Sequence, residues 1–156
     1  MKFICPLIVV DDIDVSKKFY TEILGQEIAM DFGANVTFAE SFAIQSKSSW
    51  TGFIDKPASE IRYQGNDAEL YFEEEEFDSF VERLKTYEVK YVHQVIEHAW
   101  GQRVVRFYDP DMHIIEVGES MMTVCRRFHT EGMTVEEIVK RTMFPQDVVE
   151  MFLEEE

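Results

Sequence analysis

The chain has 156 residues, 46% of them hydrophobic, and its 31 acidic and 15 basic residues give a formal net charge of −16. A chain of this length and composition can bury a core of its own, so a disordered protein is excluded. The negative charge repels phosphate backbones and anionic lipid surfaces, so we expect neither nucleic acid nor a membrane as a partner.

Two features indicate a cytoplasmic protein. The two cysteines, Cys5 and Cys125, are far apart and show no metal-type or redox-type spacing, which is typical of a reducing compartment. The apolar N-terminal stretch is too short for a membrane span, and it lacks a cleavage site for secretion. We interpret it as a buried strand over residues 4–10.

The first half of the chain has the order strand, helix and three strands. After the strand over residues 4–10, a polar break precedes apolar residues at helical spacing over 15–24, closed by Gly25. Three short strands are predicted next, over residues 27–31, 35–39 and 42–45.

The same order of elements returns in the second half. A strand over residues 68–73 precedes a helix over 77–87, and three more strands are predicted over 91–96, 103–108 and 113–117. Asp14 and Asp78 then correspond, at an offset of 64 residues (78 − 14). The pattern predicts an α+β fold of two tandem βαβββ modules, over residues 1–57 and 58–119.

Two motifs strengthen this prediction. The segment LIVVDDIDVSKKFYTEILG from Leu7 to Gly25 resembles the opening of proteins in the glyoxalase, bleomycin-resistance and extradiol dioxygenase (vicinal oxygen chelate) superfamily. The segment RFYDPDMHIIEVGE from Arg106 to Glu119 is similar to the closing hairpin of that superfamily, with Met112 in place of the usual glycine. The resemblance implies two sheets that enclose a small-molecule cavity.

The resemblance also implies four positions for metal ligands, which are His, Glu or Gln, His and Glu in metal-using members. Carried over one by one, these positions fall on Cys5, Gln45, Glu69 and Glu116. Glu116 matches the pattern, and Gln45 matches the residue found in some members. Cys5 and Glu69 depart from the pattern. Because two of the four positions have changed, glyoxalase I activity itself is disfavoured.

The chemistry of the four residues leaves the cofactor open. Glu116 stands among apolar strand residues, where a carboxylate must be paired, hydrogen-bonded, metal-bound or protonated. If Glu69 converges on it, one of the two pKa values should rise, or a divalent ion (Zn²⁺, Mn²⁺, Mg²⁺ or Ni²⁺) should neutralise both. No imidazole belongs to the set, which weakens the metal interpretation. Cys5 is also explained as a small buried strand residue.

Aromatic and polar residues beside the predicted strands are candidates for ligand contact. Trp100 stands next to a glycine in a loop, where it forms either a wall of the ligand site or a cap on the core. The other candidates are His98 and Arg103 near that loop, Tyr71 on the strand of Glu69, and Trp50 in a second connection.

Residues 120–156 form a separate extension of three predicted short helices, with a capping-box spacing at Thr134. Their apolar faces need cover, so we expect them to pack on the main body or on a second subunit of a homodimer. The acidic end of the chain argues against a role in reading DNA.

Two functions of different classes are consistent with the sequence. The first is a lyase, isomerase or dioxygenase-like enzyme in which Glu69 and Glu116 move protons or hold a metal. The second is a non-catalytic protein that sequesters a small aromatic or cationic compound, as in drug resistance. Superfamily frequency favours the enzyme, and the imperfect ligand set favours the binding protein. A third hypothesis, a regulatory partner protein, rests only on the extension.

Overall fold

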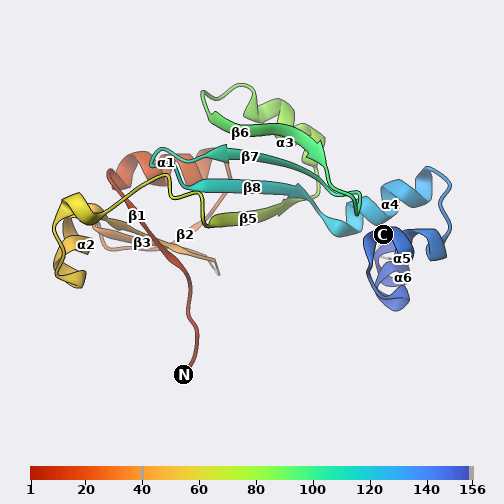
Figure 1. The fold of residues 1–156 in the computed structure, drawn as a ribbon, viewed down its shortest axis with the longest axis horizontal. Coiled ribbons are helices and arrows are strands. Elements are labelled where there is room, and N and C mark those ends of the chain that lie inside the picture. Colours follow the sequence, from red (N-terminus) through yellow and green to blue (C-terminus); the bar gives the residue numbers. More distant parts are fainter. Residues whose placement is uncertain (40, 155–156) are drawn as a thin grey trace. The chain divides into compact units, whose positions relative to one another are not determined.

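The computed structural model describes residues 1–39 and 41–154, which form two compact units (Figure 1). Of the described residues, the first unit contains 1–39, 41–68 and 108–113, and the second contains 69–107 and 114–154. None of the helices in the described ranges is both long and apolar enough to cross a bilayer.

The first unit is a four-stranded sheet with helices. Its strand order is β1-β4-β3-β2, and β1 runs parallel to β4. The elements are β1 (Leu7–Val10), α1 (Ile13–Glu22), β2 (Ile28–Asp31), β3 (Asn35–Phe38), β4 (Ala43–Ser46), α2 (Lys47–Ile54) and a 3-10 turn, η1 (Ala58–Glu60).

The core of the first unit is centred on Tyr20 of α1. Its ring packs against Phe38 at 5.5 Å and Phe42 at 4.8 Å between centroids, and the side chain is fully buried. The hydroxyl donates a 2.7 Å hydrogen bond to Asp109 Oδ2, which satisfies the one polar atom of this ring. The Asp12 side chain caps α1 by accepting from the next backbone amides.

The second unit repeats the sheet, with strand order β5-β8-β7-β6 and β5 parallel to β8. One face is covered by α3, where Phe80 packs on Phe107 with 6.4 Å between ring centroids. We call the other side of this sheet the open face. The elements are β5 (Glu69–Glu74), α3 (Phe77–Leu84), β6 (Lys90–Glu97), β7 (Arg103–Tyr108) and β8 (Ile114–Glu119).

Three helices follow β8 and form a small core of their own. They are α4 (Met121–Thr130), α5 (Val135–Thr142) and α6 (Gln146–Glu154). Val124, Phe128, Ile138 and Val149 are buried between them. The predicted capping box is confirmed, because Thr134 and Glu137 bond each other's backbone amides at the start of α5.

The predicted α+β class with two βαβββ modules and C-terminal helices is confirmed, but one strand boundary is wrong and one helix is missing from the prediction. β1 begins at Leu7 rather than at residue 4, and the apolar side chains of Phe3 and Ile4 are 80% and 77% exposed. The stretch after β4, predicted as a connection, is the helix α2, whose N-terminus is capped by Ser46.

The strand register corrects the correspondence between the two modules. Leu7 lies opposite Ala43, and Glu69 lies opposite Ile114, which takes the same place in the second sheet. Leu7, and not Cys5, is therefore the counterpart of Glu69. The helices keep the predicted offset of 64 residues (77 − 13), whereas the strands differ by 62 (69 − 7). The difference of two residues lies in the first strand, because β5 has six residues and β1 has four, and two residues separate strand from helix in both modules.

Candidate functional site

In the first unit, the two predicted ligand positions are not neighbours. Cys5 is half-buried and precedes β1, whereas Gln45 on β4 lies opposite Val9, four residues further along (9 − 5). Gln45 is buried, and its amide oxygen accepts a 2.8 Å hydrogen bond from Asn35 Nδ2. Its amide nitrogen donates to Ser49 Oγ at 2.5 Å. The Gln45 amide is thus held by protein groups.

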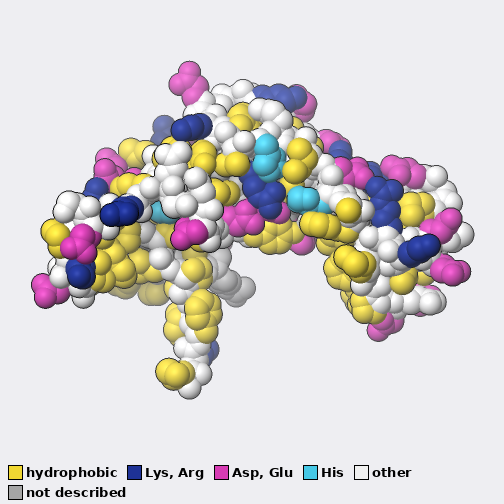
Figure 2. Space-filling view, in the orientation of Figure 1, with side chains coloured by type: hydrophobic (Ala, Val, Ile, Leu, Met, Phe, Trp, Pro, Cys, Tyr) yellow, Lys and Arg dark blue, Asp and Glu magenta, His cyan; other side chains and the backbone are white. Residues whose placement is uncertain are grey.

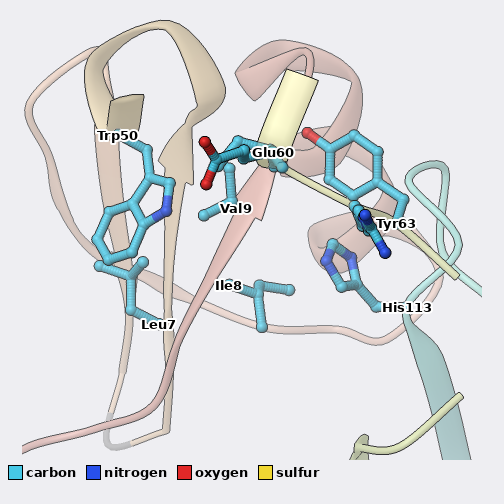
Figure 3. Close-up of a pocket in the computed structure, with 9 residues that line it drawn as sticks. Leu7, Ile8, Val9, Trp50, Glu60, Tyr63 and His113 are labelled. Carbon is cyan, nitrogen blue, oxygen red and sulfur yellow. The ribbon is translucent and has the colours of Figure 1, made fainter. Parts of the chain in front are cut away.

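A pocket of about 340 Å³ opens beside β1 in the first unit. Trp50 and Leu7 stand on one side, Tyr63 and His113 stand on the other, and Glu60 lies between the two rings (Figure 3). The floor is apolar, so the pocket combines aromatic walls with one carboxylate. The remaining lining residues are Ile8, Val9, Ile61 and Arg62.

One of these pocket residues, His113, is held by a buried aspartate, and Tyr63 packs against it. His113 Nδ1 lies 2.8 Å from Asp109 Oδ2, and Asp109 is only 3% exposed, so this contact orients the imidazole ring. The Tyr63 ring meets His113 edge to face, with 5.8 Å between centroids. Burial, followed by the negative charges of Asp111 and Asp11, raises the pKa of Tyr63 above its ordinary value.

In the second unit, Arg106 joins the two predicted glutamates. Its Nε donates to Glu69 Oε2 at 2.8 Å, and its Nη2 forms an ion pair with Glu116 Oε2. Glu116 is 5% exposed, and among the described residues none gives its Oε2 a hydrogen bond of regular geometry. Figure 2 shows basic, acidic and histidine side chains gathered over this sheet. The guanidinium thus offsets the repulsion between the two carboxylates.

Tyr71 connects this cluster to the loop between β6 and β7. It lies opposite Glu116 in the parallel ladder, and its hydroxyl donates to Glu73 Oε1 at 2.7 Å. Burial, followed by the hydrogen bond to Glu73, raises the pKa of Tyr71 to about 12. Gln102 Nε2 donates to the same hydroxyl at 2.7 Å, so the phenol is fixed from two sides.

The loop itself carries the other two aromatic candidates. His98 and Trp100 are stacked with 4.2 Å between centroids and 19° between planes, and Trp100 Nε1 donates to Gln102 Oε1 at 3.2 Å. Burial, followed by the positive charge of Arg106, lowers the pKa of His98, which favours a neutral imidazole at pH 7. Trp100 is half-buried in this turn. These contacts assemble the predicted wall residues within the second unit.

Arg103 lies on the α3 side of the sheet, away from the open face. Its guanidinium donates to Asp78 Oδ1 at 2.8 Å and to both oxygens of the buried Glu119. The predicted contact between Arg103 and a ligand stays a prediction, and the bonds in place give this residue a structural role in the second unit.

The donor chemistry does not fit a resident metal ion. Within residues 1–39 and 41–154, no three His, Cys, Asp or Glu side chains are grouped so that they could hold one. Two carboxylates of the predicted quartet are already paired with a guanidinium, and the amide oxygen is hydrogen-bonded to Asn35. A cation from the protein itself takes the place that a divalent ion would need.

The residues that sequence analysis missed are Arg106, Gln102, Glu60 and Tyr63. A signal existed for Arg106, since alternation along β7 puts it on the face opposite Arg103 and Phe107. Its contact with Glu116 depends on the pairing of β7 with β8, which the sequence alone does not provide. Glu60 and Tyr63 lie in a segment whose only regular element is a short 3-10 turn.

Comparisons with known proteins give the family. Residues 3–122 match the model of the glyoxalase-like domain. A protein of unknown function from Agrobacterium tumefaciens is 39% identical, with a TM-score of 0.68, and the match covers 77% of this chain and 94% of that one.

Two more solved structures share the fold at lower identity. A lactoylglutathione lyase from Agrobacterium tumefaciens is 21% identical, with a TM-score of 0.60 and coverage of 76% of this chain and 93% of that one. A glyoxalase/bleomycin resistance protein/dioxygenase from Nocardioides is 20% identical, with a TM-score of 0.62 and coverage of 76% and 83%. No curated protein matches the chain. The chain is a member of the glyoxalase-like domain family over residues 3–122.

Proposed function

We propose that this chain binds a small organic cation on the open face of the second sheet without a resident metal. The observation that carries the proposal is the position of Arg106, which is bonded to Glu69 and paired with Glu116. Because the guanidinium satisfies both carboxylates, the site needs no divalent ion to be electrostatically stable.

The charge of the open face favours a cation. Three carboxylates (Glu69, Glu73 and Glu116) stand against one guanidinium, so the cluster keeps a negative excess. The carboxylates of Glu69 and Glu73 are more exposed than that of Glu116, which is buried and paired with Arg106, so they are the acceptors that we assign to an N–H group of a ligand. The ring of Tyr71, 48% exposed, offers an aromatic surface for a flat cation.

The pocket of the first unit supports the same class of ligand. The ring of Trp50 and the carboxylate of Glu60 suit a planar group that carries an amine, which would displace the exposed Lys56, whose Nζ lies 3.5 Å from Glu60 Oε2. The Tyr63 ring already has a cation of the protein over it, since Lys47 Nζ lies 5.0 Å from its centroid. The pocket volume of about 340 Å³ lies at the small end of ordinary ligand pockets.

A catalytic use of the open face is the second candidate. Glu116 is a buried carboxylate beside an arginine, and such a group can accept a proton from a bound substrate. We propose a lyase or isomerase reaction with Glu116 as the base as the alternative to binding alone. Turnover that is lost in Glu116→Gln while ligand binding persists would favour this alternative.

The ligand class is tested with three naphthalene compounds that share the ring and carry one positive, neutral or negative substituent: 1-naphthylmethylamine, 1-naphthalenemethanol and 1-naphthoate. We expect the amine to raise the melting temperature most and the carboxylate least, since ligand at 100 times its Kd stabilises a protein by about 2.7 kcal/mol. Loss of the shift in Glu69→Gln assigns the amine to the open face, and loss in Glu60→Gln assigns it to the first pocket. Equal shifts for amine and carboxylate would contradict the proposal.

We further propose a cytoplasmic homodimer. Several large apolar side chains of the described residues are more than one-third exposed, including Phe32 at 70%, Phe53 at 73% and Val95 at 38%. We assign these side chains as candidates for burial against a second copy of the chain. Sedimentation equilibrium should give twice the chain mass, and a monomer at micromolar concentration would contradict this expectation.

A further inference from the structure

Apart from the first two residues of α4, the C-terminal helices lie beyond residues 3–122, which match the family, yet α4 contacts the loop between β6 and β7 (residues 98–102). In Figure 1, α4 follows β8 at the end of the sheet where β6 connects to β7. This loop carries Trp100, His98 and Gln102, the wall residues of the candidate site.

Two neighbouring residues of α4 hold the loop. Arg127 Nη2 donates a 2.7 Å hydrogen bond to the carbonyl of Gly101. Phe128 packs so closely that a Cβ atom at position 101 would lie 2.1 Å from its Cζ. Gly101 also has a φ of +92°, a conformation that other residues rarely adopt. The loop backbone is therefore fitted against α4, and a glycine is required at the contact.

The same arginine fixes α4 to the sheet. Arg127 donates from Nε and Nη2 to the two oxygens of Glu119 at 3.2 and 3.0 Å. Glu119 is fully buried at the end of β8 and also receives two hydrogen bonds from Arg103. One guanidinium thus connects the helix, the last strand and the loop.

Gln102 connects the loop to Tyr71 on the open face. Its Nε2 donates to the carbonyl of Glu119 at 2.9 Å and to the hydroxyl of Tyr71 at 2.7 Å. Its Oε1 accepts from Trp100, which stacks on His98. A shift of the loop relative to α4 would therefore move the Trp100 and His98 rings together and release the phenol of Tyr71.

We propose that the C-terminal extension positions the ligand wall of the open face, with Arg127 and Phe128 as positioning residues. The extension then determines which ring size and shape the face accepts, because it sets the place of Trp100 and the freedom of Tyr71. The link to ligand choice rests on the proposed function, whereas the link between α4 and the loop does not.

The test follows Trp100 as the single tryptophan of a Trp50→Phe protein. In the added variant Arg127→Gln, we expect a red-shifted emission and stronger acrylamide quenching, because the loop separates from α4. Exchange of the His98 and Gly101 amide hydrogens, which are bonded within the loop, should accelerate about ten-fold on loss of a charge-assisted hydrogen bond. Arg127→Lys should recover part of the native signal.

Arg126→Gln is the matched control. Its Nε donates to the carbonyl of Phe152 within the three-helix extension, so its loss loosens the helices without touching the loop. Equal effects of the two variants on Trp100 would overturn the proposal, as would a folded Arg127→Gln protein with native fluorescence and exchange. If Arg127→Gln does not fold, Gly101→Ala is the second variant, and native Trp100 signals in it would also overturn the proposal.

The fluorescence and amide-exchange measurements need no ligand, so they test the role of the extension independently of the proposed function. Absence of 1-naphthylmethylamine binding to the wild-type protein contradicts the proposed function alone. If the amine binds and Arg127→Gln leaves its affinity and the order of the three naphthalene compounds unchanged, the role in ligand choice is contradicted, even where the loop has moved.

Discussion

Replacing Arg106 by methionine is expected to lower the free energy of unfolding by about 3 kcal/mol, because it leaves the carboxylate of Glu116 buried without its cation. Glu116 is 5% exposed, so water can replace the lost partner only in part. Methionine keeps much of the apolar volume of the arginine stem, which limits the contribution of lost packing. Urea denaturation followed by circular dichroism measures the change.

The rescue variant is the double substitution Arg106→Met with Glu116→Gln. Removing the unpaired charge should restore a large part of the lost stability, since a neutral amide costs less to bury than a carboxylate. Arg62→Met is the control, because this exposed arginine should change stability by no more than about 0.5 kcal/mol. A loss in Arg106→Met as small as that in Arg62→Met would show that the guanidinium does not hold Glu116.

The second large effect is expected at Glu119. Its side chain is fully buried and is bonded by Arg103 and Arg127, so Glu119→Gln removes one charge that pairs with two. We expect a loss of about 3 kcal/mol in the free energy of unfolding. The matched control is Glu75→Gln, an exposed residue of the same type, for which no measurable change is expected.

The stability difference between the wild type and Glu119→Gln should depend on pH in a definite direction. Burial alone would raise the pKa of Glu119, but the hydrogen bonds from Arg103 and Arg127 hold it below the ordinary value of 4.5. A carboxyl group with a lowered pKa in the folded state contributes stability that is complete above its unfolded pKa and is lost as the pH falls through the folded pKa. The stability difference between wild type and Glu119→Gln should therefore be constant above about pH 5.5 and shrink in acid. A difference that grows in acid would contradict the assignment.

The repeated order of elements could be predicted from the sequence because it depends on patterns among residues that are close along the chain. Helical spacing of apolar residues predicted both module helices, and the Thr134 capping box predicted the start of α5. The start of β1 was wrong because the apolar residues Phe3 and Ile4 are indistinguishable in sequence from the buried strand that follows them.

The candidate site could be predicted from the sequence only in part, because its contacts depend on the register of the strands. Glu69 and Glu116 were identified as residues of special chemistry, but their shared partner Arg106 requires knowledge of which strands pair. The helix α2, which carries Trp50, has two serines, a threonine and a glycine that weaken its local helical signal. The contact of Arg127 with Gly101 joins residues 26 positions apart and leaves no local pattern.

The metal content of the purified protein tests most directly whether Arg106 has replaced a metal ion. The protein is prepared without chelators, dialysed against Zn²⁺, Mn²⁺, Mg²⁺ and Ni²⁺, and analysed by inductively coupled plasma mass spectrometry with Glu116→Gln beside it. We expect only traces of each metal in both proteins and no change of melting temperature on addition of EDTA. A stoichiometric metal that is present in the wild type and lost in Glu116→Gln would contradict a site built around the guanidinium.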